Sequence, residues 1–74
     1  MSRSYAVCPS EESLSAMAAH VADSTEYEAL TLYYLMLSCT QTFANEEDRK
    51  DWVIIQTEEH YQRNMAAAQL AAKE

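Results

Sequence analysis

The sequence predicts an all-α protein: an antiparallel helical hairpin preceded by a short N-terminal helix, three helices in all. The first observation behind this prediction is that the 74 residues include no glycine and only one proline. Tight β-hairpin turns rely on glycine because they need a positive φ. The second is the abundance of strong helix formers, among them Ala, Leu, Met, Glu and Gln. The third is that three segments with helically spaced apolar residues are separated by short polar breaks.

The chain is expected to hold one domain. Residues 1–8 read as an N-terminal tail and residues 9–74 as a single helical domain. A chain of this length is near the lower limit of independent folding, because small domains bury a smaller share of their surface. Association with another chain is one of the usual ways in which such domains gain stability.

The first helix is predicted over residues 10–22. Ser10 is a suitable N-cap residue, since its hydroxyl can accept a hydrogen bond from a free backbone N–H of the first turn. Leu14, Met17 and Val21 then follow at helical spacing and define one apolar face. We expect this helix to pack across the hairpin.

The second helix is predicted over residues 26–43, with Thr25 and Glu28 in the Thr-x-x-Glu pattern of a capping box. It carries the run LTLYYLMLSC, residues 30–39, in which eight of ten residues are apolar or aromatic. Because Leu30 and Leu32 point to different sides of a helix, one neighbouring helix cannot cover the whole run. We therefore expect either a homodimer through this helix or a complex with a different protein.

The third helix is predicted over residues 46–72, with Asn45 as its N-cap. Spacings of four and three define a coiled-coil-like seam. That seam consists of Ile54, Glu58, Tyr61, Met65, Ala68 and Ala72. An acid in an apolar seam is costly unless it is paired or hydrated. Glu58 therefore lies at the edge of the seam, or it faces an Arg or Lys of another chain.

Aromatic and large aliphatic residues are the predicted interface with a partner or a second copy, because tyrosine and tryptophan are frequent hot spots of binding. The alternative is that they form the core of a small helical protein. These residues are Leu30, Tyr33, Tyr34, Leu37, Trp52 and Tyr61.

The chain is acidic, with 12 acidic and 5 basic residues and a net charge of −7. This balance disfavours direct binding to nucleic acid, where Lys and Arg must replace counterions, and binding to anionic membranes. It is compatible with an acidic patch that seeks a basic partner. The predicted patch consists of Glu11, Glu12, Glu46, Glu47, Asp48 and Asp51.

No pattern indicates catalysis, a metal or another cofactor. The segment TEEHYQR, residues 57–63, lacks the Glu-x-x-His spacing of di-iron carboxylate proteins, because position 57 is Thr. No nucleophile motif or glycine-rich phosphate loop is present. Cys8 and Cys39 have no metal-binding spacing and follow a polar start without an apolar signal segment, so we expect reduced thiols and a cytoplasmic location.

These features together favour a small, acidic, non-catalytic protein-binding module that acts as an inhibitor or adaptor on a larger protein. In size, charge and helical content the chain is similar to small phage-encoded inhibitors, including anti-CRISPR and host-takeover proteins. That similarity is one of type and rests on no motif. The alternative is a helical chaperone or co-chaperone, comparable to secretion-system needle chaperones, or a structural dimerisation protein that shields a partner helix.

Overall fold

The computed structural model describes residues 9–73, which form three helices and no strand. The helices are α1 (Glu11–Val21), α2 (Tyr27–Ser38) and α3 (Glu46–Ala72). The predicted all-α class with three helices is confirmed. The predicted tail of residues 1–8, including Cys8, lies outside the described residues.

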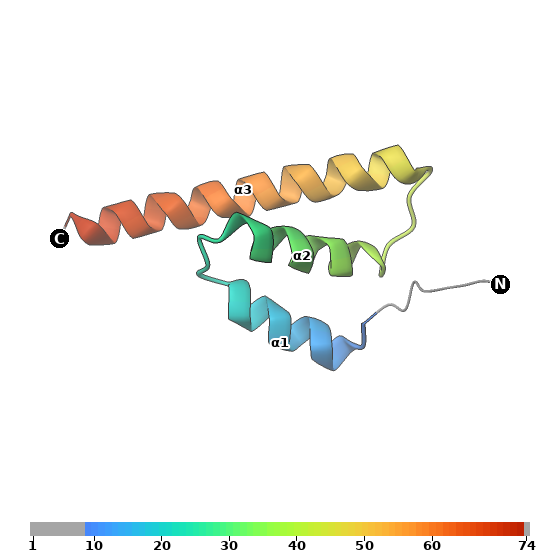
Figure 1. Ribbon diagram of the computed structural model, residues 1–74, viewed down its shortest axis with the longest axis horizontal. Coiled ribbons are helices and arrows are strands. Elements are labelled where there is room, and N and C mark those ends of the chain that lie inside the picture. Colours follow the sequence, from blue (N-terminus) through green and yellow to red (C-terminus); the bar gives the residue numbers. More distant parts are fainter. Residues whose placement is uncertain (1–8, 74) are drawn as a thin grey trace.

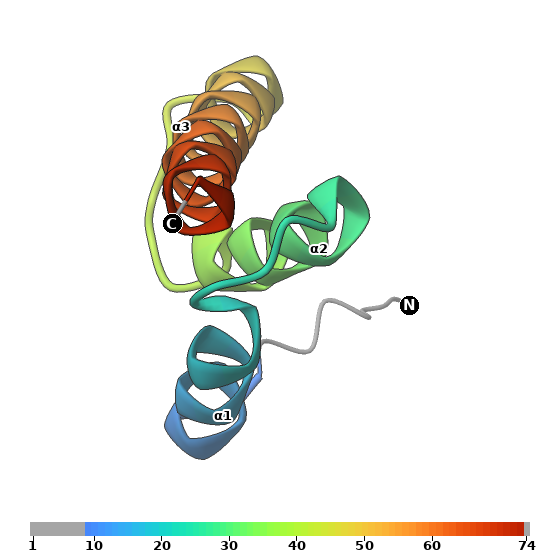
Figure 2. The same cartoon turned by 90° about the vertical axis from the view of Figure 1, so that its left-hand side faces the viewer.

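The second helix is the centre of the fold, with α1 on one side and α3 on the other (Figures 1 and 2). Successive helices run in opposite directions, so α2 and α3 form the predicted antiparallel hairpin. Within the described residues α1 packs against α2 and not against α3. The first helix therefore lies beside α2 and does not cross the hairpin as expected.

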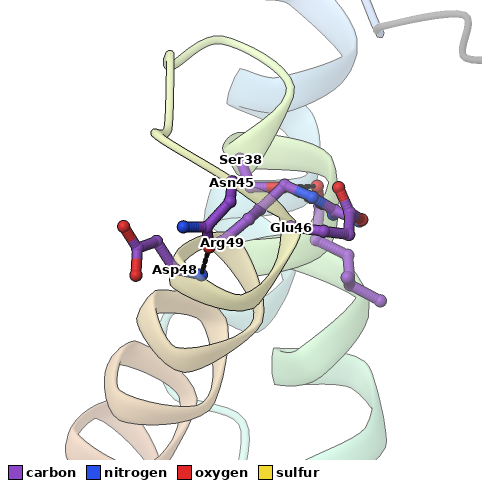
Figure 3. A network of polar contacts seen from close by, with 6 residues as sticks. Ser38, Asn45, Glu46, Asp48 and Arg49 are labelled. Atoms are coloured by element: carbon purple, nitrogen blue, oxygen red, sulfur yellow. Dashed lines mark hydrogen bonds and ion pairs between the residues drawn. The ribbon is translucent and has the colours of Figure 1, made fainter.

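Two of the three N-caps predicted from the sequence are formed. The Ser10 hydroxyl accepts a hydrogen bond from the Ser13 N–H at 3.1 Å, and the Asn45 side chain accepts one from the Asp48 N–H at 2.8 Å (Figure 3). Each cap satisfies a backbone donor that has no partner within the helix. These caps are local, which explains why they can be identified from a few letters of sequence.

The capping box predicted at Thr25 and Glu28 is wrong. The N-cap position of α2 is Glu26, and no side chain caps it. Two residues before Glu26, the Ser24 hydroxyl accepts a hydrogen bond from the Glu26 N–H at 3.0 Å. The Ser24 side chain thus forms a short turn with the backbone that orders the residues just before α2. Serine readily makes such local side-chain-to-backbone hydrogen bonds.

The second helix ends at Ser38, five residues before the predicted limit. Two hydroxyl groups explain this early end. Ser38 donates to the Leu35 carbonyl at 2.6 Å, and Thr40 donates to the Leu37 carbonyl at 2.7 Å. Side chains that bond to nearby carbonyls offer the backbone an alternative to helix continuation, and residues 39–45 form a connection to α3.

The third helix packs through a different face from the predicted seam. Its buried residues are Val53 and Thr57, and His60 and Asn64 continue the same stripe at half-buried positions. Ile54, the predicted start of the seam, is 59% exposed. A hydrophobicity pattern favours the apolar seam, whereas His60 and Asn64 face inward because they find hydrogen-bond partners there.

The hydrophobic core is small. Its buried members are Val21 of α1, Leu30 of α2 and Val53 of α3, one from each helix. The molecule is elongated, with dimensions of 55 × 26 × 16 Å, because the C-terminal part of α3 extends beyond α2 (Figure 1). Residues 66–73, which form this extension, are all exposed.

Candidate protein-binding surface

The inner side of the hairpin is an aromatic cluster around Tyr34 of α2. The Tyr34 ring makes edge contacts with Tyr33, Trp52 and His60, at centroid distances of 4.9, 6.0 and 5.7 Å. Trp52 also contacts Phe43 of the connection at 5.7 Å. Burial raises the pKa of the Tyr34 hydroxyl above its usual value of 10. These rings hold α3 against α2.

Two polar side chains of α3 fasten it to the turn between α1 and α2. His60 Nε2 is 3.1 Å from the Ala22 carbonyl oxygen, which can only accept, so Nε2 carries the proton. In the neutral ring Nδ1 then accepts a hydrogen bond from the Tyr34 hydroxyl at 2.8 Å. Asn64 donates to the carbonyls of Ala22 and Ser24 at 3.0 and 2.6 Å. We call these two residues the His60–Asn64 latch.

A second polar contact lies where the first turn of α2 meets α3. The Tyr27 hydroxyl donates to Glu58 Oε1 at 3.0 Å, and its ring lies edge-on to Tyr61 at 5.2 Å. The hydrogen bond to Glu58 raises the pKa of Tyr27. Glu58 also accepts from Gln62 at 3.0 Å and is exposed. Glu58 thus lies at the edge of the helix contact, and the alternative that it faces an Arg or Lys of another chain stays a prediction.

The opposite end of the hairpin is closed by Arg49 of α3. Its guanidinium donates to the Ser38 hydroxyl at 3.3 Å and pairs with Glu46 (Figure 3). The hydrogen bond from Arg49 lowers the pKa of Glu46. Arg49 thereby joins the last residue of α2 to the first turn of α3.

The residues predicted at a partner interface lie largely between the helices of the chain itself. Leu30 is fully buried, so the prediction that it contacts a partner is wrong. The apolar run does not predict that Leu30 is the residue buried between the helices, because several other apolar residues of the run could equally face inward. The other five are half-buried, and their contact with a partner stays a prediction. They are Tyr33, Tyr34, Leu37, Trp52 and Tyr61.

Large apolar side chains are instead exposed at positions outside the predicted partner interface. On α2 these include Leu32 (55% exposed) and Leu35 (38% exposed), and on α3 they include Ile54. The signal available in the sequence was the separation of Leu32 from Leu30 around the helix, which puts the two on different sides. Tyr27, Ile55 and Leu70 are the remaining exposed large hydrophobic residues within the described part of the chain.

We call the exposed residues Leu32 and Leu35 of α2 and Ile54 of α3, which belong to two packed helices, the outer apolar face. Leu32 and Leu35 lie one turn apart on the side of α2 away from buried Leu30. Ile54 lies one turn before Glu58, on the side of α3 that Tyr27 contacts. A hollow lined by Glu28, Thr31 and Leu32 adjoins this face.

The six acids of the predicted patch divide into two groups, one at the start of α1 and one at the start of α3. All six are exposed. Both helix starts lie at the same end of the molecule, although on opposite sides of α2 (Figures 1 and 2). The first group is Glu11 and Glu12, and the second is Glu46, Glu47, Asp48 and Asp51.

A further hollow lies where α3 leaves the turn between α1 and α2, lined by Asp23, Asn64, Ala67 and Ala68. Within residues 9–73 no three His, Cys, Asp or Glu side chains are grouped as metal ligands. None of the helices in this range combines the length and hydropathy that a bilayer span requires.

No protein-family model matches the chain, and the searches of curated proteins and of solved structures return no significant match.

Proposed function

We propose that this chain is a non-catalytic protein-binding module that acts by covering a surface of a larger protein, as an inhibitor or adaptor. One observation carries this proposal. Within the described residues only three hydrophobic side chains are buried, whereas six large ones are exposed. Full burial of one such side chain is worth about 1.5–3 kcal/mol. A partner that covers several of them therefore gains a large driving force.

The placement of these side chains supports the same proposal. Single exposed hydrophobic residues are ordinary, whereas a contiguous group is typical of an interaction site. Leu32, Leu35 and Ile54 are contributed by two packed helices, and helices offer a firmer contact surface than loops.

The acidic end suggests a particular form of inhibition. Carboxylates at the starts of α1 and α3 make one end of the molecule negative, which suits a basic groove that otherwise holds nucleic acid. We propose such a role, of the kind that phage anti-defence and anti-CRISPR proteins perform, in the cytoplasm. Charge reversal of Glu46, Glu47 and Asp48 together should then abolish inhibition, and affinity should fall steeply with added salt.

The exposed stripe of α2 also favours a second candidate, a chaperone or structural dimerisation role in which α2 shields another helix. In that case Leu32→Ser should abolish function, while the reversal of charges at Glu46, Glu47 and Asp48 should not. The homodimer expected from the sequence belongs to this candidate and stays a prediction. Light scattering of the purified chain distinguishes a mass of 8.4 kDa from its double.

The experiment that tests the proposed function is photo-crosslinking in cells that naturally contain the chain. A photoreactive phenylalanine analogue is placed at Leu32 in one variant and at Glu59, an exposed position of α3 outside the outer apolar face, in a matched control. We expect a discrete covalent adduct with another protein from position 32 and none from position 59. Equal labelling from both positions, or none from either, would contradict the proposal.

A further inference from the structure

We infer that the outer apolar face binds an amphipathic helix of a partner protein that carries Lys or Arg beside its apolar stripe. This inference rests on the proposed protein-binding function and specifies its partner. The face comprises Leu32 and Leu35 of α2 and Ile54 of α3, which are 55%, 38% and 59% exposed. Two packed helices present these side chains, the arrangement that receives a third helix in helix-in-groove recognition.

Two carboxylates lie together at one end of this face. Glu28 lies one turn before Leu32 on α2, and Glu58 lies one turn after Ile54 on α3. Because the two helices are antiparallel, these acids lie at the same end of the face, and the Tyr27–Glu58 hydrogen bond of 3.0 Å holds the two helices together there. At the other end Asp51 is accompanied by the exposed Lys50, and both lie one turn before Ile54. An occupying helix therefore meets negative charge mainly at the end marked by Glu28 and Glu58.

The hollow beside Leu32 has the chemistry to receive a long basic side chain. Its lining combines the apolar Leu32 with Thr31 and the carboxylate of Glu28. Lys and Arg place an aliphatic stem along apolar surface while the charged head reaches a polar partner. A Lys or Arg of the occupying helix can thus contact Leu32 with its stem and Glu28 with its charge.

Charge also selects against two other occupants. A second copy of the chain has the same net charge of −7 and would bring its own Glu28 and Glu58 to the contact. Like charges at an interface oppose association. Nucleic acid is repelled for the same reason. A basic helix is the occupant whose apolar and charged parts both match the face.

The test uses isothermal titration calorimetry of the full chain with synthetic amphipathic peptides of about 18 residues, long enough to form a helix. One peptide has leucines at helical i, i+3 and i+7 spacing with flanking lysines. The second has glutamates in place of the lysines. We expect the lysine peptide to bind, to lose affinity between about 50 and 300 mM salt, and to exceed the glutamate peptide at least about tenfold.

Matched variants locate the binding. We expect Leu32→Ser and Glu28→Gln each to weaken the lysine peptide by about threefold to tenfold. The controls are Ile55→Ser, which removes an exposed isoleucine about 100° further round α3, and Glu59→Gln, which removes an exposed acid outside the face. These controls should bind within about twofold of the parent chain. All four positions are exposed, and circular dichroism confirms that each variant is folded.

Three results would overturn the inference: no binding of the lysine peptide, equal binding of both peptides, or equal weakening by the control variants. A light-scattering mass that halves with Leu32→Ser would show that a second copy covers the face instead. Failure of the proposed function has a different signature, the absence of any adduct in the crosslinking experiment. If adducts form at position 32 and are unaffected by Glu28→Gln, the protein-binding function is supported and the inference of a basic partner is contradicted.

Discussion

At the scale of single residues, Thr57 is the least satisfied part of the interior. Its side chain is 1% exposed, and its hydroxyl has no hydrogen-bond partner among the described residues. A buried polar group without a partner costs about 1–3 kcal/mol. The neighbouring stripe residues His60 and Asn64 avoid this cost because each reaches a carbonyl.

We therefore expect Thr57→Val to stabilise the chain by about 1 kcal/mol, because valine has a similar shape and no hydroxyl to desolvate. Urea unfolding followed by circular dichroism measures this. Thr31→Val is the matched control, since the Thr31 hydroxyl donates to the Tyr27 carbonyl at 2.8 Å. A gain from Thr31→Val as large as that from Thr57→Val would contradict the explanation.

The contact between Glu46 and Arg49 predicts a dependence of stability on pH. Because Arg49 lowers the pKa of Glu46 in the folded chain, the ionised carboxylate favours folding. This contribution is present above the unfolded-state pKa of about 4.3 and is lost as the pH falls through the lower folded-state value. Glu46→Gln should therefore destabilise the chain at neutral pH, with the difference vanishing at strongly acidic pH.

Thermal unfolding of parent and variant across the acidic range measures this difference. Glu47→Gln is the control, because it removes a carboxylate from the same helix turn while leaving the Glu46–Arg49 pair in place. We expect a smaller effect from Glu47→Gln, limited to the loss of its interaction with the helix dipole. A Glu46→Gln effect that persists unchanged in acid would show that the ion pair is not its cause.

At the scale of elements, local signals predicted the three helices and two of their caps, whereas contacts between distant residues could not be predicted. Helix existence and the two side-chain caps followed from composition and from Ser10 and Asn45, whose partners are three residues away. The inward face of α3 could not be predicted, because His60 and Asn64 bond to carbonyls 38 to 42 residues earlier. A hydrophobicity pattern assigns such residues to the surface.

The same holds for the candidate site. The sequence indicated that the apolar run of α2 exceeds what one neighbour can cover, and exposed Leu32 and Leu35 bear this out. It did not indicate which side stays outside, because that depends on where α1 and α3 pack. The apolar run therefore favours an interface position for Leu30, which belongs to the core.

The His60–Asn64 latch should stabilise the docking of α3 on the α1–α2 turn. Asn64→Ala removes two hydrogen bonds, a loss of about 1–2 kcal/mol, which the better helix propensity of alanine offsets by about 0.5 kcal/mol. We expect a net destabilisation of about 1 kcal/mol in urea unfolding. Gln62→Ala, which removes only an exposed bond to Glu58, should change stability by less than about 0.5 kcal/mol. Equal effects would argue against the latch.

At the scale of the whole molecule, the length of 55 Å arises because α3 is longer than α2, the helix that packs against it. Residues 66–73 of α3 are exposed and lie beyond the latch. Their helical order comes from continuation of a well-anchored helix, because helix growth is much easier than nucleation. Stability is therefore concentrated in residues 11–65.

Deletion of residues 69–74 should lower the helical signal in circular dichroism while changing the free energy of unfolding by less than about 0.5 kcal/mol. Deletion from residue 64 onward is the control, because it also removes the latch residue Asn64 and should destabilise the chain clearly. If the shorter deletion costs as much as the longer one, the extension packs against the rest of the chain.

The aromatic cluster has a further consequence, for spectroscopy. Trp52 is the only tryptophan of the chain, and Tyr34 of α2 lies beside it at 6.0 Å. Tyrosine emission overlaps tryptophan absorption, so light absorbed by Tyr34 is transferred efficiently to Trp52 while α2 and α3 are docked. Separation of the two helices restores tyrosine emission. The purified, unlabelled protein thus contains its own optical gauge of hairpin closure, readable on the timescale of a stopped-flow experiment.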